Sequence, residues 1–173
     1  MRRRIRRAGF TLIEMAVTLL VIGIVTAALI PRLPDPGAWR LKSAARKLAA
    51  TITYVYNRSA ATQLTYRLTL DIDGRRYFVS LLNTDRAFEP VELAFARETA
   101  LPPRVFFADA QSPAQGKVNA GAAVIHFMPT GFVEPSEIHL KDEDGAEFTL
   151  RVNPLTGEVT LLEGHVEWQK PQV

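Results

Sequence analysis

The most prominent pattern in the sequence is a long apolar run near the N-terminus. It extends over 21 residues from Phe10 to Ile30, contains one charged residue, Glu14, and ends at Pro31. Because a helix rises about 1.5 Å per residue, this run would form a helix of about 31 Å, which matches the hydrocarbon thickness of a bilayer. We therefore predict a transmembrane helix over residues 10–30.

The residues that flank the run indicate its orientation. Five arginines precede it, at positions 2, 3, 4, 6 and 7, and only Arg32 follows it closely. Since positive charge stays on the cytoplasmic side, we expect a cytoplasmic N-terminus and a C-terminal domain across the membrane. A secretory signal peptide has a similar basic head, but its apolar part is about 7 to 15 residues long and precedes small residues, whereas Ile30-Pro31-Arg32 follows this run.

Glu14 is the one acid inside the run. A carboxylate at the centre of a transmembrane helix costs about 2.5 to 3.5 kcal/mol, and such residues normally have a functional partner. If the chain is cut after Gly9, Phe10 acquires a free amino group, and the ammonium of a neighbouring subunit would neutralise Glu14 inside a bundle of helices. The alternative is a side chain that reaches the membrane surface without a partner.

A breaker cluster and then a helical pattern follow the run. Leu33-Pro34-Asp35-Pro36-Gly37 contains two prolines and a glycine, which predicts a kink or hinge over residues 31–37. From Trp39 to Thr62, one set of small or apolar residues recurs at spacings of three and four: Leu41, Ala45, Leu48, Ile52, Val55 and Ser59. This spacing predicts an amphipathic helix with one face on the core. Basic residues lie away from that face: Arg40, Lys42, Arg46, Lys47 and Arg58.

After Gln63 the period changes from helical to alternating. Residues 65–72 predict a strand, Asp73-Gly74 predicts a two-residue type I′ turn, and residues 76–83 predict the return strand. Four more strand candidates are separated by turn sequences, at residues 123–128, 137–141, 147–153 and 158–162. The order predicts an α+β domain in which the helix packs on antiparallel sheets.

Two stretches have no clear period. Three prolines interrupt residues 84–104, so we expect an irregular loop there, with a short helical turn near residues 91–96. Residues 105–108 are a short strand candidate. The composition of residues 111–121 predicts a mobile surface loop.

The charge distribution limits the possible partners. The formal charge of +3 and the pI of about 9.4 would suggest nucleic acid, but five basic residues precede Gly9. The rest of the chain has 16 basic and 18 acidic side chains, a net charge of −2. Residues 32–104 carry a net charge of +5 and residues 105–173 carry −6. This asymmetry is either an accident of a solvated surface or a complementarity between stacked subunits.

Few residues suggest catalysis or metal binding. The chain has no cysteine, so neither a disulfide nor a thiolate metal site can form. His126, His139 and His165 are scattered without ligand spacing, and we interpret them as structural histidines. Asp142-Glu143-Asp144 has the composition of a calcium site, but an ordinary solvated hairpin turn accounts for it better. Motifs of a catalytic nucleophile or a phosphate loop are absent. We predict no enzyme activity, no metal and no cofactor.

The N-terminal sequence closely resembles a known type of leader. Basic residues followed by Ala8-Gly9-Phe10-Thr11-Leu12-Ile13-Glu14 and an apolar run are similar to the class III leader of type IV pilins and type II secretion pseudopilins. The resemblance implies that a prepilin peptidase cleaves between Gly9 and Phe10 and methylates the new N-terminal Phe10. It also implies that Glu14 is the assembly glutamate and that Pro31 kinks the helix.

With this resemblance the chain divides into four parts. These are a leader over residues 1–9, a transmembrane and assembly helix over residues 10–30, a hinge over residues 31–37 and a periplasmic domain over residues 38–173. The implied fold is pilin-like, with a long N-terminal helix whose first half is transmembrane and whose second half is amphipathic and packed on antiparallel sheets.

Further motifs narrow the resemblance. Phe127-Met128-Pro129-Thr130-Gly131, Ile138-His139-Leu140 and Val152-Asn153-Pro154-Leu155-Thr156-Gly157-Glu158-Val159 are similar to the C-terminal pattern of the H-type minor pseudopilins and FimT-type minor pilins, the GspH/FimT family. Residues 43–48 and 58–60 resemble the helix of that family.

The resemblance implies a minor pseudopilin near the tip of the pseudopilus of a type II secretion system. The implied partners are other minor pseudopilins, the major pseudopilin, prepilin peptidase and the inner-membrane assembly platform. The implied location is the bacterial inner membrane, with a single pass. The alternative is a FimT-type minor pilin that binds DNA; the acidic C-terminal half disfavours nucleic acid, whereas the basic residues of the helix favour it.

Overall fold

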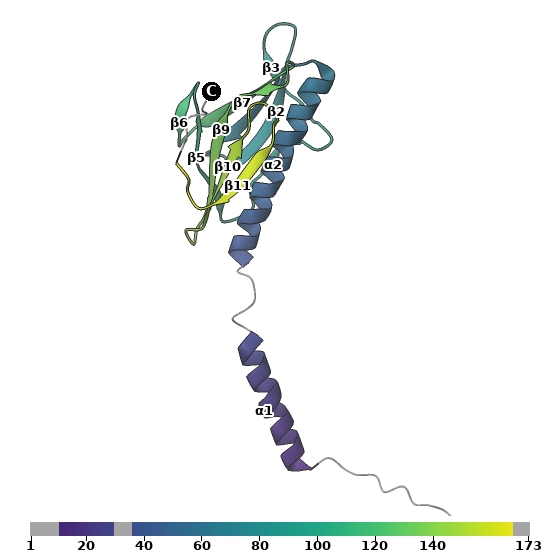
Figure 1. Ribbon diagram of the computed structural model, residues 1–173, viewed down its shortest axis with the longest axis vertical. Coiled ribbons are helices and arrows are strands. Elements are labelled where there is room, and N and C mark those ends of the chain that lie inside the picture. Colours follow the sequence, from purple (N-terminus) through teal and green to yellow (C-terminus); the bar gives the residue numbers. More distant parts are fainter. Residues whose placement is uncertain (1–10, 30–35, 168–173) are drawn as a thin grey trace, which may run out of the picture. The chain divides into compact units, whose positions relative to one another are not determined.

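The computed structural model describes residues 11–29 and 36–167. The chain divides into two compact units, Met1–Asp35 and Pro36–Val173. The first unit contains helix α1, and the second contains helix α2 and the described strands (Figure 1).

Helix α1, Leu12–Leu29, contains 18 residues and confirms the helical prediction for this part of the apolar run. Phe10, Ile30 and residues 31–35 of the predicted hinge, Pro31 among them, lie outside the described residues. Within residues 11–29 and 36–167, no helix has both the length and the hydropathy that a membrane crossing requires.

Helix α2, Pro36–Thr62, is the predicted amphipathic helix. Every residue of the predicted stripe is at most 1% exposed: Leu41, Ala45, Leu48, Ile52, Val55 and Ser59. Burial of each large aliphatic side chain stabilises the fold by about 1.5 to 3 kcal/mol. The helix begins three residues before the predicted start, so Pro36 and Gly37 belong to it and not to the hinge. A proline suits this first position because its missing N–H would have no partner there.

The strands form two antiparallel sheets, as predicted. The first sheet has the order β3-β2-β1-β7-β8, with β4 also paired to β2, and the second has the order β11-β10-β9-β5-β6. The strands of the first sheet are β1 (Tyr66–Asp71), β2 (Arg76–Leu82), β3 (Phe88–Pro90), β4 (Thr99–Ala100), β7 (Ala122–Met128) and β8 (Phe132–Val133). Those of the second are β5 (Val105–Ser112), β6 (Gly116–Val118), β9 (Ser136–Asp142), β10 (Glu147–Val152) and β11 (Val159–Glu163).

Helix α2 packs on strands of both sheets and closes one core (Figure 1). On β1, Leu68 and Leu70 are fully buried at alternate positions, and on β9, Ile138 and Leu140 are. The apolar side chains thus alternate along each strand with a period of two, while the polar residues between them, Thr69 and His139, are buried on the opposite face. The predicted α+β class is therefore confirmed.

The hairpin between β1 and β2 differs from the prediction. Asp71 pairs with Arg76, so residues 72–75 connect the strands instead of two residues. Positive φ occurs at Arg75, 52°, and not at Asp73 and Gly74, as a type I′ turn would require. The reason is the Asp71 carboxylate, whose Oδ1 accepts the Gly74 N–H at 2.8 Å. A Cβ on Gly74 would overlap Asp71 Oδ2, so glycine makes room for this contact.

Residues 84–104 contain the short strands β3 and β4. The predicted helical turn at residues 91–96 is wrong, because that segment forms a bridge between Leu93 and Ala96 beside the core. Residues 94–95 form a tight turn, in which the Ala96 N–H donates to the Leu93 carbonyl oxygen at 3.2 Å, and pairing to β2 on both sides of the segment leaves no room for a helical turn.

The predicted loop over residues 111–121 is wrong in part, because residues 111–112 and 116–118 belong to strands. Strand β5 continues to Ser112, four residues beyond the predicted strand end, and β6 pairs with it through Gln111 and Lys117. The polar side chains suggested a loop, but a strand at a sheet edge is held by its main-chain hydrogen bonds and tolerates polar side chains.

Candidate functional site

The predicted N-terminal site is described in part. Gly9, Phe10 and Pro31 lie outside the described residues, so their roles stay predictions. Glu14 lies in the first turn of α1 and is exposed.

Thr11 caps the N-terminus of α1. Its Oγ1 accepts the Glu14 N–H at 3.3 Å, and its carbonyl oxygen accepts the N–H groups of Glu14 at 3.1 Å and Met15 at 3.2 Å. Thr11 and Glu14 therefore have the spacing of a capping box, in which a threonine precedes a glutamate by three residues. The sequence prediction missed this role, although the Thr-x-x-Glu pattern is visible in the sequence.

The position of Glu14 is favourable within the helix itself. A negative side chain in the first turn interacts with the positive end of the helix dipole, which is worth about 0.3 to 1 kcal/mol at an exposed position. Among the residues that the structure describes, no cationic side chain pairs with Glu14.

The rest of the α1 surface is apolar on every side. Large side chains such as Leu12, Leu19 and Ile24 are 62 to 90% exposed. The two threonines of the helix donate their hydroxyls to main-chain oxygens four residues earlier, Thr18 to Glu14 and Thr26 to Ile22, both at 2.7 Å. Their polar groups are therefore satisfied inside the helix. A helix that is apolar all round needs an apolar environment, either lipid or other helices.

Side chains in the C-terminal half of α2 form hydrogen bonds with the turns of two C-terminal sequence motifs, residues 127–131 and 152–159. The Tyr56 hydroxyl lies 2.6 Å from the Leu155 carbonyl oxygen and 3.0 Å from that of Gly131. Thr53 Oγ1 donates to the Gly157 carbonyl oxygen at 3.1 Å. Gly157 has a φ of 66°, and a Cβ there would overlap the Tyr56 ring at Cγ. The glycine is thus required both by its backbone angle and by the tyrosine ring.

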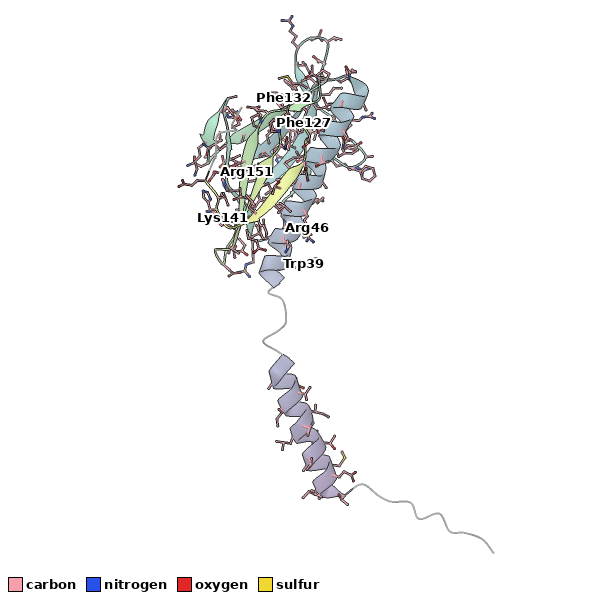
Figure 2. The ribbon with its side chains drawn as sticks, viewed as in Figure 1. Trp39, Arg46, Phe127, Phe132, Lys141 and Arg151 are labelled. Atoms are coloured by element: carbon pink, nitrogen blue, oxygen red, sulfur yellow. The ribbon has the colours of Figure 1, made fainter. Side chains whose placement is uncertain are left out.

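Two exposed aromatic residues lie near opposite ends of α2. Figure 2 shows Trp39 at its first turns and Phe132 beside its C-terminal end. Trp39 is 69% exposed and Phe132 is 37% exposed. Each end of the domain therefore offers an aromatic side chain for contact with another molecule.

A basic and aromatic groove lies beside the middle of α2. A cavity of about 390 Å³ is lined by Lys47 and Thr51 on the helix and by Phe95 and Arg97 from the segment between β3 and β4. The Phe95 ring is 77% exposed and contacts Tyr54 edge to face, with ring centres 5.6 Å apart. Cationic groups next to an exposed ring suit an acidic or nucleic-acid partner.

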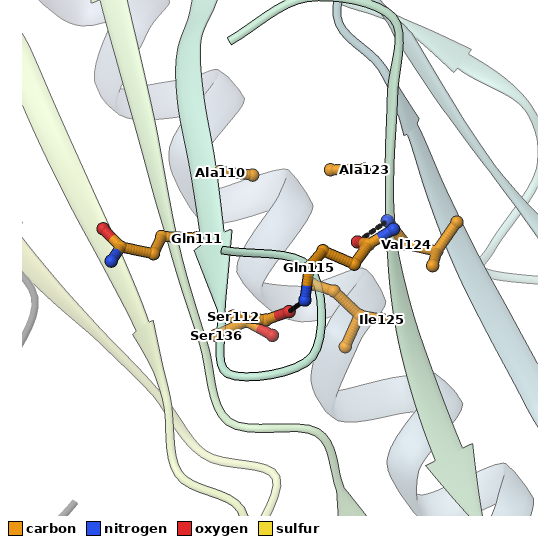
Figure 3. Close-up of a pocket in the computed structure, with 8 residues that line it drawn as sticks. All are labelled: Ala110, Gln111, Ser112, Gln115, Ala123, Val124, Ile125 and Ser136. Atoms are coloured by element: carbon orange, nitrogen blue, oxygen red, sulfur yellow. Dashed lines mark hydrogen bonds between the residues drawn. The ribbon is translucent and has the colours of Figure 1, made fainter. Parts of the chain in front are cut away.

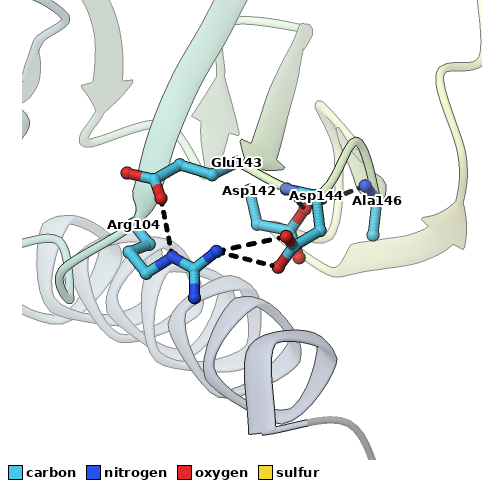
Figure 4. Close-up of polar contacts among 5 residues, drawn as sticks. All are labelled: Arg104, Asp142, Glu143, Asp144 and Ala146. Atoms are coloured by element: carbon cyan, nitrogen blue, oxygen red, sulfur yellow. Dashed lines mark hydrogen bonds and ion pairs between the residues drawn. The ribbon is translucent and has the colours of Figure 1, made fainter.

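The acidic turn between β9 and β10 is an ion-pair cluster (Figure 4). Arg104 donates from Nε to Glu143 Oε2 at 2.6 Å and from Nη2 to Asp144 Oδ1 at 3.1 Å. Asp142 Oδ1 accepts the N–H groups of Asp144 and Ala146. The hydrogen bond to Glu143, and then the negative charges of Asp144 and Glu143, raise the pKa of Arg104. The carboxylates of Asp142, Glu143 and Asp144 therefore accept hydrogen bonds from the protein itself, which agrees with the interpretation of this segment as an ordinary hairpin turn.

A small cavity lies between β5 of the second sheet and β7 of the first sheet (Figure 3). The Gln115 side chain binds the main chain of β7 beside the cavity: its Oε1 accepts the Val124 N–H at 2.8 Å. Ser112 Oγ accepts the Gln115 N–H at 3.3 Å and holds the turn. The cavity volume is about 10 Å³, which admits no more than a water molecule.

The histidines are not scattered in space. His126 pairs with Glu134, with 3.1 Å between Nδ1 and Oε2. The rings of His139 and His165 stack with centres 3.9 Å apart, and His139 Nδ1 lies 2.7 Å from Asp109 Oδ1. His139 and His165, which are far apart in the sequence, are therefore neighbours in the fold, and their interpretation as structural histidines stays a prediction. The spacing of His139 and His165 in the sequence does not indicate this contact, because it depends on how β9, β10 and the segment after β11 lie next to one another.

Comparisons with known proteins agree with the sequence resemblance. Residues 4–30 match the family model described as the prokaryotic N-terminal methylation motif. No match is found among curated protein sequences.

Two solved structures of the minor pseudopilin EpsH from the type II secretion system of Vibrio cholerae are similar in fold. One is 14% identical and has a TM-score of 0.58, over 72% of this chain and 97% of that chain. The other is 12% identical and has a TM-score of 0.61, over 74% of this chain and 97% of that chain. The chain thus joins a prokaryotic N-terminal methylation motif to a domain with the fold of the minor pseudopilin EpsH, and both findings agree with the resemblance stated from the sequence.

Proposed function

We propose that this protein is a minor pseudopilin of a type II secretion system, a structural subunit near the tip of the periplasmic pseudopilus. The observation that carries the proposal is the combination of a methylation motif at residues 4–30 with the EpsH-like domain fold. The motif supports processing and assembly, and the domain fold supports the H-type minor position within the assembly. The role is structural and not enzymatic.

The N-terminal segment supplies insertion, processing and assembly. Residues 10–30 as a whole insert into the inner membrane with the arginines on the cytoplasmic side. Prepilin peptidase removes residues 1–9 and methylates Phe10. The apolar surface of α1 then packs on sister helices, and Glu14 pairs with the N-terminal ammonium of a neighbouring subunit, where both charges are neutralised.

The domain supplies the contacts along the pseudopilus. Its partners are other minor pseudopilins and the major pseudopilin, and the inner-membrane assembly platform drives their incorporation. The opposite net charges of residues 32–104 and 105–173 would fix the register and orientation of stacked subunits more than they add affinity.

The test is a deletion of the gene followed by parallel assays of exoprotein secretion, twitching and transformation. We expect loss of secretion alone, restored by the intact gene. Loss of twitching or transformation with normal secretion would contradict the assignment and favour a type IV pilus.

The second candidate is a FimT-type minor pilin that binds DNA. The groove formed by Lys47, Phe95 and Arg97 favours it, since it combines cationic groups with an exposed ring. An electrophoretic mobility shift assay with residues 36–173 discriminates between the two. DNA retention that weakens steeply with salt, and that Lys47→Ala with Arg97→Ala abolishes, would favour this candidate over the first.

A further inference from the structure

A row of polar side chains crosses the second sheet on its face opposite α2. Asp109 on β5, His139 on β9 and Thr149 on β10 are paired neighbours across the three strands. Asp109 and His139 are 4% and 2% exposed. The segment that follows β11 covers this row, because Thr149 Oγ1 donates to the Gly164 carbonyl oxygen at 2.8 Å and accepts the Val166 N–H at 3.0 Å. His165 is thereby held directly over His139.

We propose that Asp109, His139 and His165 form a binding site for a divalent transition-metal ion of the zinc type. Each residue offers one ligand atom, and these atoms all lie within 4.8 Å of one another. Two imidazoles and one carboxylate are a donor set that zinc prefers, with a fourth position left for water. The inference is independent of the proposed function.

The contacts of each ring assign one of its nitrogens to a metal ion and the other to a protein acceptor. His139 Nε2 lies 3.0 Å from the Val166 carbonyl oxygen, which can only accept, so Nε2 carries a proton. His139 Nδ1 lies 2.7 Å from Asp109 Oδ1, and a metal ion would take the place of the proton shared between these two atoms, which is released on binding. His165 Nδ1 lies 3.2 Å from Glu147 Oε2, which favours a proton there and leaves Nε2 as the ligand atom. A carbonyl or carboxylate on the distal ring nitrogen is the usual support of a metal-binding histidine.

The electrostatics of the site favour a cation. The buried Asp109 carboxylate already attracts one, since Lys117 Nζ on β6 lies 3.1 Å from its Oδ2. The Lys117 side chain is half exposed and can move into solvent. Lys117, His139 and His165 also line an open cavity of about 310 Å³, together with Gln111 and Glu167, through which an ion can enter.

Binding requires one rearrangement. The two rings stack at an angle of 22°, whereas a tetrahedral zinc ion needs ligand atoms about 3.3 Å apart and lies in the plane of each ring. His165 must therefore turn out of the stack. Its side chain is 37% exposed and does not belong to the apolar core, so the movement costs the stacking on His139 but no apolar packing.

The test is isothermal titration of the untagged full chain in detergent with zinc chloride. We expect one saturable zinc ion per chain, with affinity reduced at least about tenfold in His165→Gln and in Asp109→Asn. His126→Gln, which changes a histidine paired to another glutamate, is the matched control and should bind as the wild type does. Lys117→Met should bind more tightly, because it removes the competing ammonium.

Cobalt provides a second readout. Cobalt(II) in the wild-type chain should give the intense visible absorption of a tetrahedral site, and His165→Gln should lose it. Absence of saturable zinc binding, equal affinity in His165→Gln and wild type, or weaker binding in Lys117→Met would each overturn the site. Because His165 is exposed, its substitution should leave the domain folded, so that loss of zinc binding in His165→Gln reports on the site itself.

Discussion

At the scale of single residues, Glu14 has two physical roles that overlap. It occupies the third position of a helix capped by Thr11, where a carboxylate is favourable within the chain itself. It is also an acid on an otherwise apolar helix surface, where it needs a partner from another molecule. The two roles make different demands on the side chain, so substitutions can separate them.

Glu14→Val and Glu14→Gln should both impair incorporation into filaments while leaving cleavage after Gly9 intact, because neither side chain can pair with an ammonium. Gln keeps the hydrogen-bonding capacity that a capping box uses, and Val does not. The measurement is the amount of each processed variant in sheared filaments. Normal stoichiometry of the Gln variant would contradict the charge-pairing role and favour capping.

Thr11→Ala should destabilise the first turn of α1 by about 1 kcal/mol, because the Glu14 N–H loses its side-chain acceptor. Hydrogen exchange of the amides at the start of the helix in detergent measures this. Thr18→Ala is the matched control: its hydroxyl bonds to a carbonyl inside the helix, so the first-turn amides should exchange at the wild-type rate. Equal effects of the two substitutions would argue against capping.

Gly157→Ala should lower the unfolding free energy of the domain by about 2 to 4 kcal/mol, because the new Cβ meets the Tyr56 ring and the residue has a φ of 66°. Gly164→Ala separates the two causes. Gly164 has a φ of 84° with no atom within 4 Å of the added Cβ, so it should cost about 1 to 2 kcal/mol. Urea unfolding of both variants gives the comparison, and equal losses would contradict the steric contribution of Tyr56.

At the scale of elements, the β1–β2 hairpin depends on a charged side chain. The Gly74 N–H, and then the Arg76 guanidinium, lower the pKa of Asp71 below its ordinary value. A carboxyl group with a lowered pKa in the folded state stabilises the protein above its unfolded pKa, and this contribution is lost as the pH falls through the folded pKa.

Asp71→Asn should therefore reduce the loss of stability between about pH 6 and about pH 3, because the titrating group is gone. Urea unfolding at both pH values measures the difference. Asp73→Asn is the control; Asp73 Oδ2 accepts the Gly121 N–H at 2.9 Å but takes no part in the Asp71 and Arg76 pair. An unchanged pH dependence in Asp71→Asn would contradict the role of its carboxylate in the hairpin.

Elements also differ in how well the sequence predicted them. Helix α2 was predictable because Leu41, Leu48 and Ile52 recur at helical spacing over many turns. Strand β6 and the end of β5 were not, because their polar side chains have no alternation and only pairing within the second sheet holds them extended. Local periodicity is visible where apolar side chains alternate with polar ones; the edge strand β6 has little buried surface, and the end of β5 is buried through the small residues Ala110 and Ser112.

At the scale of the whole molecule, the proposed cleavage changes the charge of the protein. The full chain has a formal charge of +3, and the chain without the five leader arginines has side chains that sum to −2. N-terminal sequencing of the membrane-extracted protein should begin at a methylated Phe10, and isoelectric focusing should show an acidic species. A start at Met1, or beyond Ile30, would contradict the prepilin interpretation.

The sequence by itself determined the prepilin-type N-terminus, the amphipathic helix, the α+β class and most strands, because each depends on neighbours within a few residues. Only the tertiary structure decided that Asp109, His139 and His165 meet and that Gly157 packs on Tyr56. The physical reason is strand register. Contacts between residues separated by about 25 to 100 positions depend on how strands pair and which face each side chain takes, and one step of register would reverse every face.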